Sequence, residues 1–268
     1  MSDKIKVALD FKQALLVQAR VVYALMLRET KTVFGRSKFG YMWVVIQTAF
    51  NVIVIWVIRG VIRSGTVPGL PLPVFLICGF TCWRIFSDTI SKVMVSVDAN
   101  RSLLYFSKVR HFDLGLARAL LIAATNIVVM ILLLLLVYLL GFKFVLGNMW
   151  PLLYSLTMLL AMGLGLGYFC CAIKRYTDSV SVLVSMLLRI GIFVSGVMFS
   201  LGHLPPSFHF LIEWNPILQL VEYSRSSFAY AYPGASYMKL GLVSFVSLAI
   251  LAIGMVMEKV TRTKTDAI

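Results

Sequence analysis

The sequence predicts an all-α integral membrane protein with six transmembrane helices, and three observations lead to this prediction. Of the 268 residues 60% are hydrophobic and the mean hydropathy is +0.91, whereas soluble domains are about 45–50% apolar. The run from Leu120 to Gly141 contains no charged side chain and is as long as the ~20 residues that cross a bilayer core. Basic residues also alternate between successive connecting segments, as they do in multi-span proteins.

The expected organisation is one membrane domain with short flanking segments. Residues 1–38 form a cytoplasmic or interfacial segment, residues 39–258 the transmembrane domain, and residues 259–268 a cytoplasmic tail. The spans are expected at residues 39–62, 72–97, 115–141, 150–172, 178–201 and 237–258.

The net charge of +14 would suggest nucleic-acid binding in a soluble protein, but the apolar bulk excludes that interpretation. Seventeen of the 25 Lys and Arg residues lie before Gly40, in the loops 98–118 and 173–177, and in the tail, against four in the alternate loops. By the positive-inside rule both termini are cytoplasmic. The N-terminus lacks an apolar stretch followed by a small-residue cleavage site, so no cleaved signal peptide is expected.

The N-terminal segment is amphipathic. Leucine, valine and methionine residues between Leu9 and Met26 alternate with charged or amide residues such as Lys12, Gln18 and Arg20. The pattern favours a helix lying in the membrane interface over a solvated tail.

The second span carries Arg84, Asp88 and Lys92 at a spacing of four residues, which places them on one helical face. A charge at mid-membrane costs about 2.5–3.5 kcal/mol on insertion scales, so these groups must avoid lipid. Either they form a local ladder of ion pairs, or they form the polar wall of a translocation path. Arg189, in the fifth span, either meets Asp88 or lines the same path.

The segment 99–118 places Leu103, Leu104, Tyr105 and Phe106 beside charged residues. Such a loop has no core of its own, so it predicts a short amphipathic helix docked on a soluble partner rather than on the membrane surface.

The loop 202–236 is too apolar for a solvated loop. Apolar residues flank Asn215-Pro216, and two short helices broken at the proline fit this pattern. They are too short to cross the bilayer, so they should dip into it and return.

Catalytic and metal chemistry is not expected. Cys78 and Cys82 share a helix face, but the histidines are distant in sequence, so small buried residues are favoured over metal ligands. The segment Gly35–Gly40 has the glycine spacing of a phosphate loop, but Tyr41 and the following methionine replace its Lys-Ser/Thr.

Four stretches of the sequence are recognisable together: LRETKTVFGRSKFGYMW (Leu27–Trp43), PVFLICGFTCWRIFSDTIS (Pro73–Ser91), NRSLLYFSKVRHFDLGLARALL (Asn100–Leu121) and WNPILQLVEYSR (Trp214–Arg225). They resemble the permeases of ABC-2 type exporters, in particular those of capsular polysaccharide export. The resemblance covers most of the chain in the same order, except for the N-terminal extension and the tail.

The resemblance implies a homodimer in the bacterial inner membrane, bound to two copies of a separate ATPase subunit. ATP and Mg²⁺ would be bound by that ATPase, and this chain would hold no cofactor. Lipid-linked polysaccharide would leave through a path between the two permeases, and periplasmic and outer-membrane capsule export proteins would continue its route. Membrane lipids, but no nucleic acid, complete the expected partners.

The resemblance also assigns expected roles to residues. An interface helix and the start of the first span involve Arg28, Lys31, Phe34, Gly35, Gly40 and Tyr41. A coupling helix on the ATPase involves Asn100, Arg101, Leu103, Leu104, Tyr105, Phe106, Lys108, Arg110 and Asp113. Periplasmic re-entrant gate helices involve Trp214, Asn215, Pro216, Glu222 and Arg225. The candidate channel-lining residues are Trp83, Arg84, Asp88, Lys92 and Arg189.

Three other interpretations stay open at this point. The same architecture serves exporters of O-antigen or teichoic acid. A secondary transporter could use Arg84, Asp88 and Arg189 as an ion relay, but few acids approach a span and no inverted repeat is visible. A scaffold without transport activity would not need charges inside its spans.

Overall fold

The computed structural model describes residues 13, 16–30, 40–61, 69–100, 110–199, 214–229, 232 and 238–265. In these ranges the regular elements are all helical, which confirms the predicted fold class at that level. They are α2 (Gly40–Val61), α3 (Leu72–Met94), α4 (His111–Leu139), α5 (Trp150–Lys174), α6 (Val180–Val194), α8 (Pro216–Arg225), the 3₁₀ turn η4 (Ser226–Phe228) and α9 (Leu240–Thr265). A further helix covers residues 16–30.

Five of these helices, α2, α3, α4, α5 and α9, are long and apolar enough to cross a bilayer. α6 is apolar but has only 15 residues, which is short of a full crossing. It ends before Gly196, whose φ of +74° is a left-handed conformation that glycine adopts without strain. The six-span arrangement therefore stays a prediction.

The helix α3 forms the centre of the bundle. It packs against α2, α4, α5, α6 and α8, and most of its side chains are buried, including Phe75, Ile85 and Val93. By contrast α2 and α9 expose large apolar side chains such as Phe50 and Phe245. Lipid tails are as apolar as these side chains, so exposing the side chains to the bilayer carries no free-energy cost.

Glycines on α5 let two neighbours approach closely. A Cβ atom at Gly167 would lie 2.7 Å from the Cβ of Val93 on α3, and one at Gly254 of α9 would lie 2.0 Å from the carbonyl oxygen of Gly165. Small residues at such contacts allow close packing of membrane helices. The α3–α5–α9 layer is therefore held by backbone proximity on both faces of α5.

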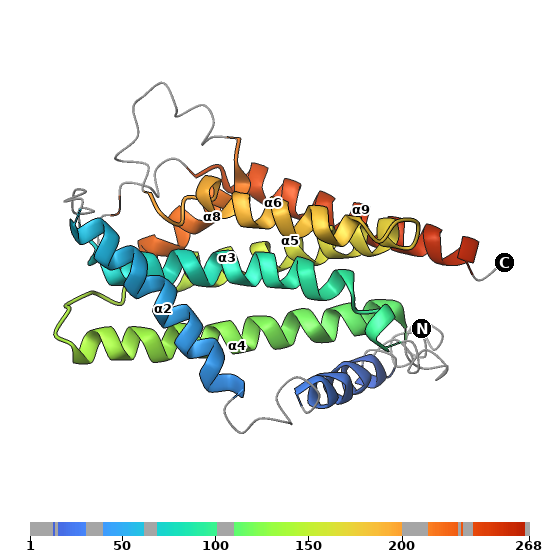
Figure 1. The fold of residues 1–268 in the computed structure, drawn as a ribbon, viewed down its shortest axis with the longest axis horizontal. Coiled ribbons are helices and arrows are strands. Elements are labelled where there is room, and N and C mark those ends of the chain that lie inside the picture. The colour runs from blue at the N-terminus through green and yellow to red at the C-terminus, as the bar shows by residue number, and fades with distance from the viewer. Residues whose placement is uncertain are drawn as a thin grey trace, which may run out of the picture.

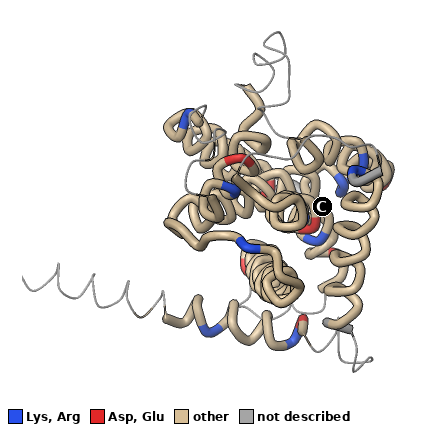
Figure 2. The backbone as a smooth tube through the Cα atoms, turned by 90° about the vertical axis from the view of Figure 1, so that its left-hand side faces the viewer, with Lys and Arg blue, Asp and Glu red and all other residues tan. Residues whose placement is uncertain are grey.

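The helices α3, α4, α5, α6 and α9 run along the long axis, while α2 crosses α3 and α4 obliquely (Figure 1). Seen along that axis, the helix of residues 16–30 lies across the end of the bundle rather than along it (Figure 2). Its place in the membrane interface stays a prediction.

Candidate functional site

The α3 charge ladder, Arg84, Asp88 and Lys92, begins with a local ion pair. Nε of Arg84 lies 3.4 Å from Oδ2 of Asp88, and Nη1 of Arg84 donates a hydrogen bond to Oγ1 of Thr48 on α2. The guanidinium thus joins two helices, and the predicted ion-pair contact within the ladder is present.

The ladder also lines a cavity of about 770 Å³ between α2, α3 and α6, here called the α2–α6 cavity. All five candidate channel-lining residues meet there: Trp83, Arg84, Asp88, Lys92 and Arg189. Arg189 is exposed on the α6 wall. Three cations against one acid give the lining an excess of positive charge, which attracts anions in a low-dielectric surrounding.

The α2 wall of this cavity contains Gln47 and Asn51, which the sequence analysis missed. They are four residues apart and so share a helix face. Two amides within a mostly apolar span were the available signal, because polar groups inside a span usually face protein or water.

Three of the candidate gate residues, Trp214, Asn215 and Pro216, lie at the start of α8. Oδ1 of Asn215 accepts hydrogen bonds from the backbone N–H of Ile217 at 3.1 Å and of Leu218 at 3.3 Å, and Pro216 occupies the first helical position. This is a standard helix start. Nδ2 of Asn215 donates to the carbonyl oxygen of Val194 at 3.1 Å, so the start of α8 is tied to the end of α6. Trp214 is exposed.

Glu222 and Arg225 form a fully buried ion pair. Nη1 of Arg225 lies 2.6 Å from Oε1 of Glu222, and the exposed fractions of the two side chains are 0% and 1%. Nη2 of Arg225 donates to the carbonyl oxygens of Gly196 at 2.9 Å and Val197 at 3.0 Å. The guanidinium also stacks on the ring of Phe75, 3.4 Å from its centroid. Arg225 therefore anchors α8 to α3 and to the turn after α6. Any short helix before α8 lies outside the described residues.

The ends of the candidate coupling segment are held by the N-terminal helix. At one end, Nδ2 of Asn100 donates to Oε1 of Glu29 at 2.9 Å, and Nη1 of Arg28 donates to Oδ1 of Asn100 at 2.9 Å. At the other end, Asp113 accepts a hydrogen bond from Gln18 and one from the backbone N–H of Arg110 at 3.0 Å. Arg101, Leu103, Leu104, Tyr105, Phe106 and Lys108 lie outside the described residues.

Among the remaining interface candidates, Gly40 is the first residue of α2 and Tyr41 the second. Lys31, Phe34 and Gly35 lie outside the described residues. The contacts of Glu29, Gln18 and Arg118 were not predicted, because nothing in the sequence indicates which loop the N-terminal helix meets.

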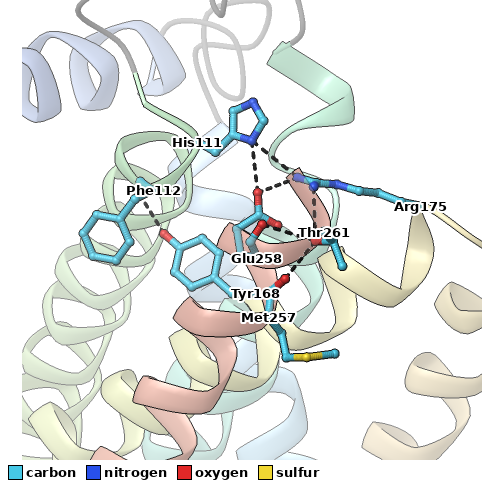
Figure 3. A network of polar contacts seen from close by, with 7 residues as sticks. All are labelled: His111, Phe112, Tyr168, Arg175, Met257, Glu258 and Thr261. Atoms are coloured by element: carbon cyan, nitrogen blue, oxygen red, sulfur yellow. Dashed lines mark hydrogen bonds and ion pairs between the residues drawn. The ribbon is translucent and has the colours of Figure 1, made fainter. Parts of the chain in front are cut away.

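A second polar network joins α4, α5 and α9 at the same end of the bundle (Figure 3). Oε1 of Glu258 lies 3.0 Å from Nδ1 of His111 and 2.5 Å from Nη2 of Arg175. Nη1 of Arg175 donates to Oγ1 of Thr261 at 3.2 Å, and the Tyr168 hydroxyl donates to the Phe112 carbonyl oxygen at 2.7 Å. The N-terminus of α4 is thus fixed from two sides, by this network and by Gln18.

The profile of the family described as ABC-2 type transporter matches residues 20–229 of this chain. That match includes most of the N-terminal helix, all of α2 to α6, and α8. The chain belongs to the ABC-2 type transporter family. The matched residues of this ABC-2 type chain include the lining of the α2–α6 cavity, the helix α8 and the candidate coupling segment.

Several named proteins are similar to this chain over most of their own length. The polysialic acid transport protein KpsM of Escherichia coli is 29% identical over 87% of this chain and 92% of its own. The capsule polysaccharide export inner-membrane protein BexB of Haemophilus influenzae is 26% identical over 93% of this chain and 94% of its own. The protein CtrC of Neisseria meningitidis, also named as a capsule polysaccharide export inner-membrane protein, is 24% identical over 82% of this chain and 83% of its own.

Proposed function

We propose that this chain is the permease subunit of an ATP-driven exporter that moves lipid-linked capsular polysaccharide across the bacterial inner membrane. The observation that carries the proposal is the end-to-end similarity to relatives named for capsule or polysialic acid transport. The electropositive α2–α6 cavity supports it, because charged and amide side chains offer contacts to an anionic polymer in an otherwise apolar bundle.

Two copies would form the path. In a single chain Arg189 is exposed on α6 among apolar neighbours such as Met186 and Phe193. A charge left facing lipid costs about 2.5–3.5 kcal/mol on insertion scales. A second chain closing the α2–α6 cavity would shield Arg189 and turn an open wall into an enclosed polar passage. The homodimer thus accounts for a charge that one chain leaves exposed.

Energy would come from a separate ABC ATPase that binds ATP and Mg²⁺. The segment between Asn100 and Asp113 is proposed to seat on that ATPase. Its two ends are hydrogen-bonded to the helix of residues 16–30, so a displacement of the segment would reach the N-terminal helix and α4 together. Periplasmic and outer-membrane capsule export proteins would receive the polymer, and both chain termini would be cytoplasmic.

The test is deletion of the chromosomal gene, followed by measurement of polymer at the cell surface and in the cytoplasm. We expect surface polymer to disappear and cytoplasmic polymer to accumulate, and the wild-type gene to restore export. A strain whose surface polymer is unchanged by the deletion would contradict the proposed function.

A further inference from the structure

Two adjoining hollows lie on the side of α3 that faces α4. The polar pocket, of about 380 Å³, is formed by the N-terminal helix, α2, α3 and α4. Its charged lining residues are Glu29, Arg84, Asp88, Lys92 and Arg118. The apolar groove, of about 520 Å³, runs between α2 and α4 and is lined by Met42, Val45, Leu121, Ala124, Thr125, Val128, Val129 and Leu132. Leu121 and Thr125 line both, so the polar pocket opens into the groove.

The polar pocket has one cation more than its acids neutralise. Asp88 pairs with Arg84 at 3.4 Å and Glu29 pairs with Arg118 at 3.0 Å. Lys92 is exposed and its ammonium group makes no hydrogen bond or ion pair to another residue that the structure describes. Nη1 of Arg118 donates to the backbone carbonyl oxygen of Lys92 at 3.1 Å, and both residues line the pocket. An ammonium and a guanidinium that line one pocket are suited to a phosphate group.

The position of the two hollows along the helices fits one leaflet of a bilayer. Lys92 lies in the last turn of α3, at the end of the bundle that the positive-inside rule assigns to the cytoplasm. From Leu121 to Leu132 the groove follows α4 for about 16 Å at 1.5 Å per residue. One leaflet of the hydrocarbon core is about 15 Å thick. A molecule with an anionic head in the pocket and an acyl chain in the groove would therefore lie at its normal depth.

We propose that the polar pocket and the apolar groove bind one anionic glycerophospholipid of the cytoplasmic leaflet. Lys92 and Arg118 hold its phosphate, and one acyl chain lies along Val128 and Leu132. The site is separate from the α2–α6 cavity but shares the α3 charge ladder with it. A phosphate bound to Lys92 would therefore contact a residue that also lines the α2–α6 cavity. The proposal does not depend on what the cavity transports.

Lipid binding to the purified full-length chain, measured by native mass spectrometry, tests the proposal. Phosphatidylglycerol is titrated against phosphatidylcholine with the same acyl chains. We expect one phosphatidylglycerol per chain, bound about tenfold more tightly than phosphatidylcholine, because charge pairing adds to acyl contact only for the anionic lipid. Lys92→Gln should weaken phosphatidylglycerol binding about fivefold and leave phosphatidylcholine unchanged. Val128→Trp should weaken both lipids about tenfold by filling the groove.

Matched controls separate this site from general lipid contact. Lys143→Gln removes an exposed cation elsewhere, and Val256→Trp enlarges a similarly exposed valine on α9; both should bind as wild type. Equal affinity for the two lipids, or wild-type binding by Val128→Trp, would overturn the proposal.

Discussion

Arg118 of α4 and Glu29 of the N-terminal helix form an ion pair, with 3.0 Å between Nε and Oε1, and their side chains are only 13% and 10% exposed. The same Glu29 oxygen accepts the hydrogen bond from Asn100. One carboxylate thus joins the N-terminal helix, α4 and Asn100 at the start of the candidate coupling segment. These contacts fix the N-terminal helix to the rest of the chain, and its amphipathic pattern alone does not reveal them.

Replacing Glu29 with Gln should loosen this junction. The amide loses the charge that Arg118 faces, so we expect thermal unfolding in detergent to show a loss of about 1–3 kcal/mol. Export should fall as well, because the N-terminal helix would no longer follow the coupling segment. Arg20→Gln, an exposed change on the same helix, is the control and should be neutral. Wild-type stability and export in Glu29→Gln would argue against the junction.

Because Glu222 and Arg225 form a buried ion pair, substitutions of the two residues should have non-additive effects on the free energy of unfolding. Arg225→Met leaves a buried carboxylate without its guanidinium and should destabilise the chain by about 3–5 kcal/mol. The double variant with Glu222→Met removes both charges, so it should be more stable than Arg225→Met alone. Denaturant or thermal unfolding of all three proteins gives the coupling energy. Additive losses would mean that the two residues act independently.

Exchanging charges between residues of the α2–α6 cavity tests whether Asp88 is paired with Arg84 or with Arg189. Asp88 is ion-paired with Arg84 at 3.4 Å, while Arg189 lies across the cavity on α6. The double variant Arg84→Asp with Asp88→Arg should therefore recover part of the export lost in either single variant. Asp88→Arg combined with Arg189→Asp should recover none. Surface polymer is the readout, and rescue by the second combination would instead pair Asp88 with Arg189.

If the candidate coupling segment binds the ATPase, adding charge to its apolar residues should weaken that association. Leu104→Asp and Phe106→Asp would place charge on the proposed apolar docking surface and weaken its contact with the ATPase, without changing a predicted span. Co-purification of the ATPase with the permease should drop about tenfold or more, while membrane insertion stays normal. Lys143→Asp, in the loop after α4, is the matched control. Unchanged co-purification in both segment variants would remove the coupling assignment.

Close packing between α5 and α9 predicts a position-specific effect of side-chain size. A Cβ at Gly254 would lie 2.0 Å from the Gly165 carbonyl oxygen, whereas a Cβ at Gly241 would meet nothing within 4 Å. Gly254→Leu should therefore cost at least about 1–3 kcal/mol through overpacking, and Gly241→Leu on the same helix should be tolerated. Thermal unfolding of the two variants makes the comparison. Equal stability would show that α9 does not pack on α5 through these glycines.

The candidate site was predictable where polar residues stood out against an apolar background. The spacing of Arg84, Asp88 and Lys92 indicated one face, and all three line the α2–α6 cavity. Gln47 and Asn51 were visible by the same criterion but are uncharged, so their signal was weaker. The contacts of Glu29 with Asn100 and of Glu258 with His111 join residues 71 and 147 positions apart, and no local pattern encodes such pairs.

The helical class follows from the amino-acid pattern, because an uninterrupted apolar run of about 20 residues can satisfy its own backbone hydrogen bonds in lipid as a helix. The same pattern also determined the faces of those helices, because residues four apart share one side. Only the tertiary structure decided that Arg189 reaches the cavity of Arg84, that Arg225 holds α8 in place, and that the N-terminal helix meets both ends of the segment after α3. These contacts depend on how helices pack around α3, and packing is set by many side chains at once rather than by any local pattern.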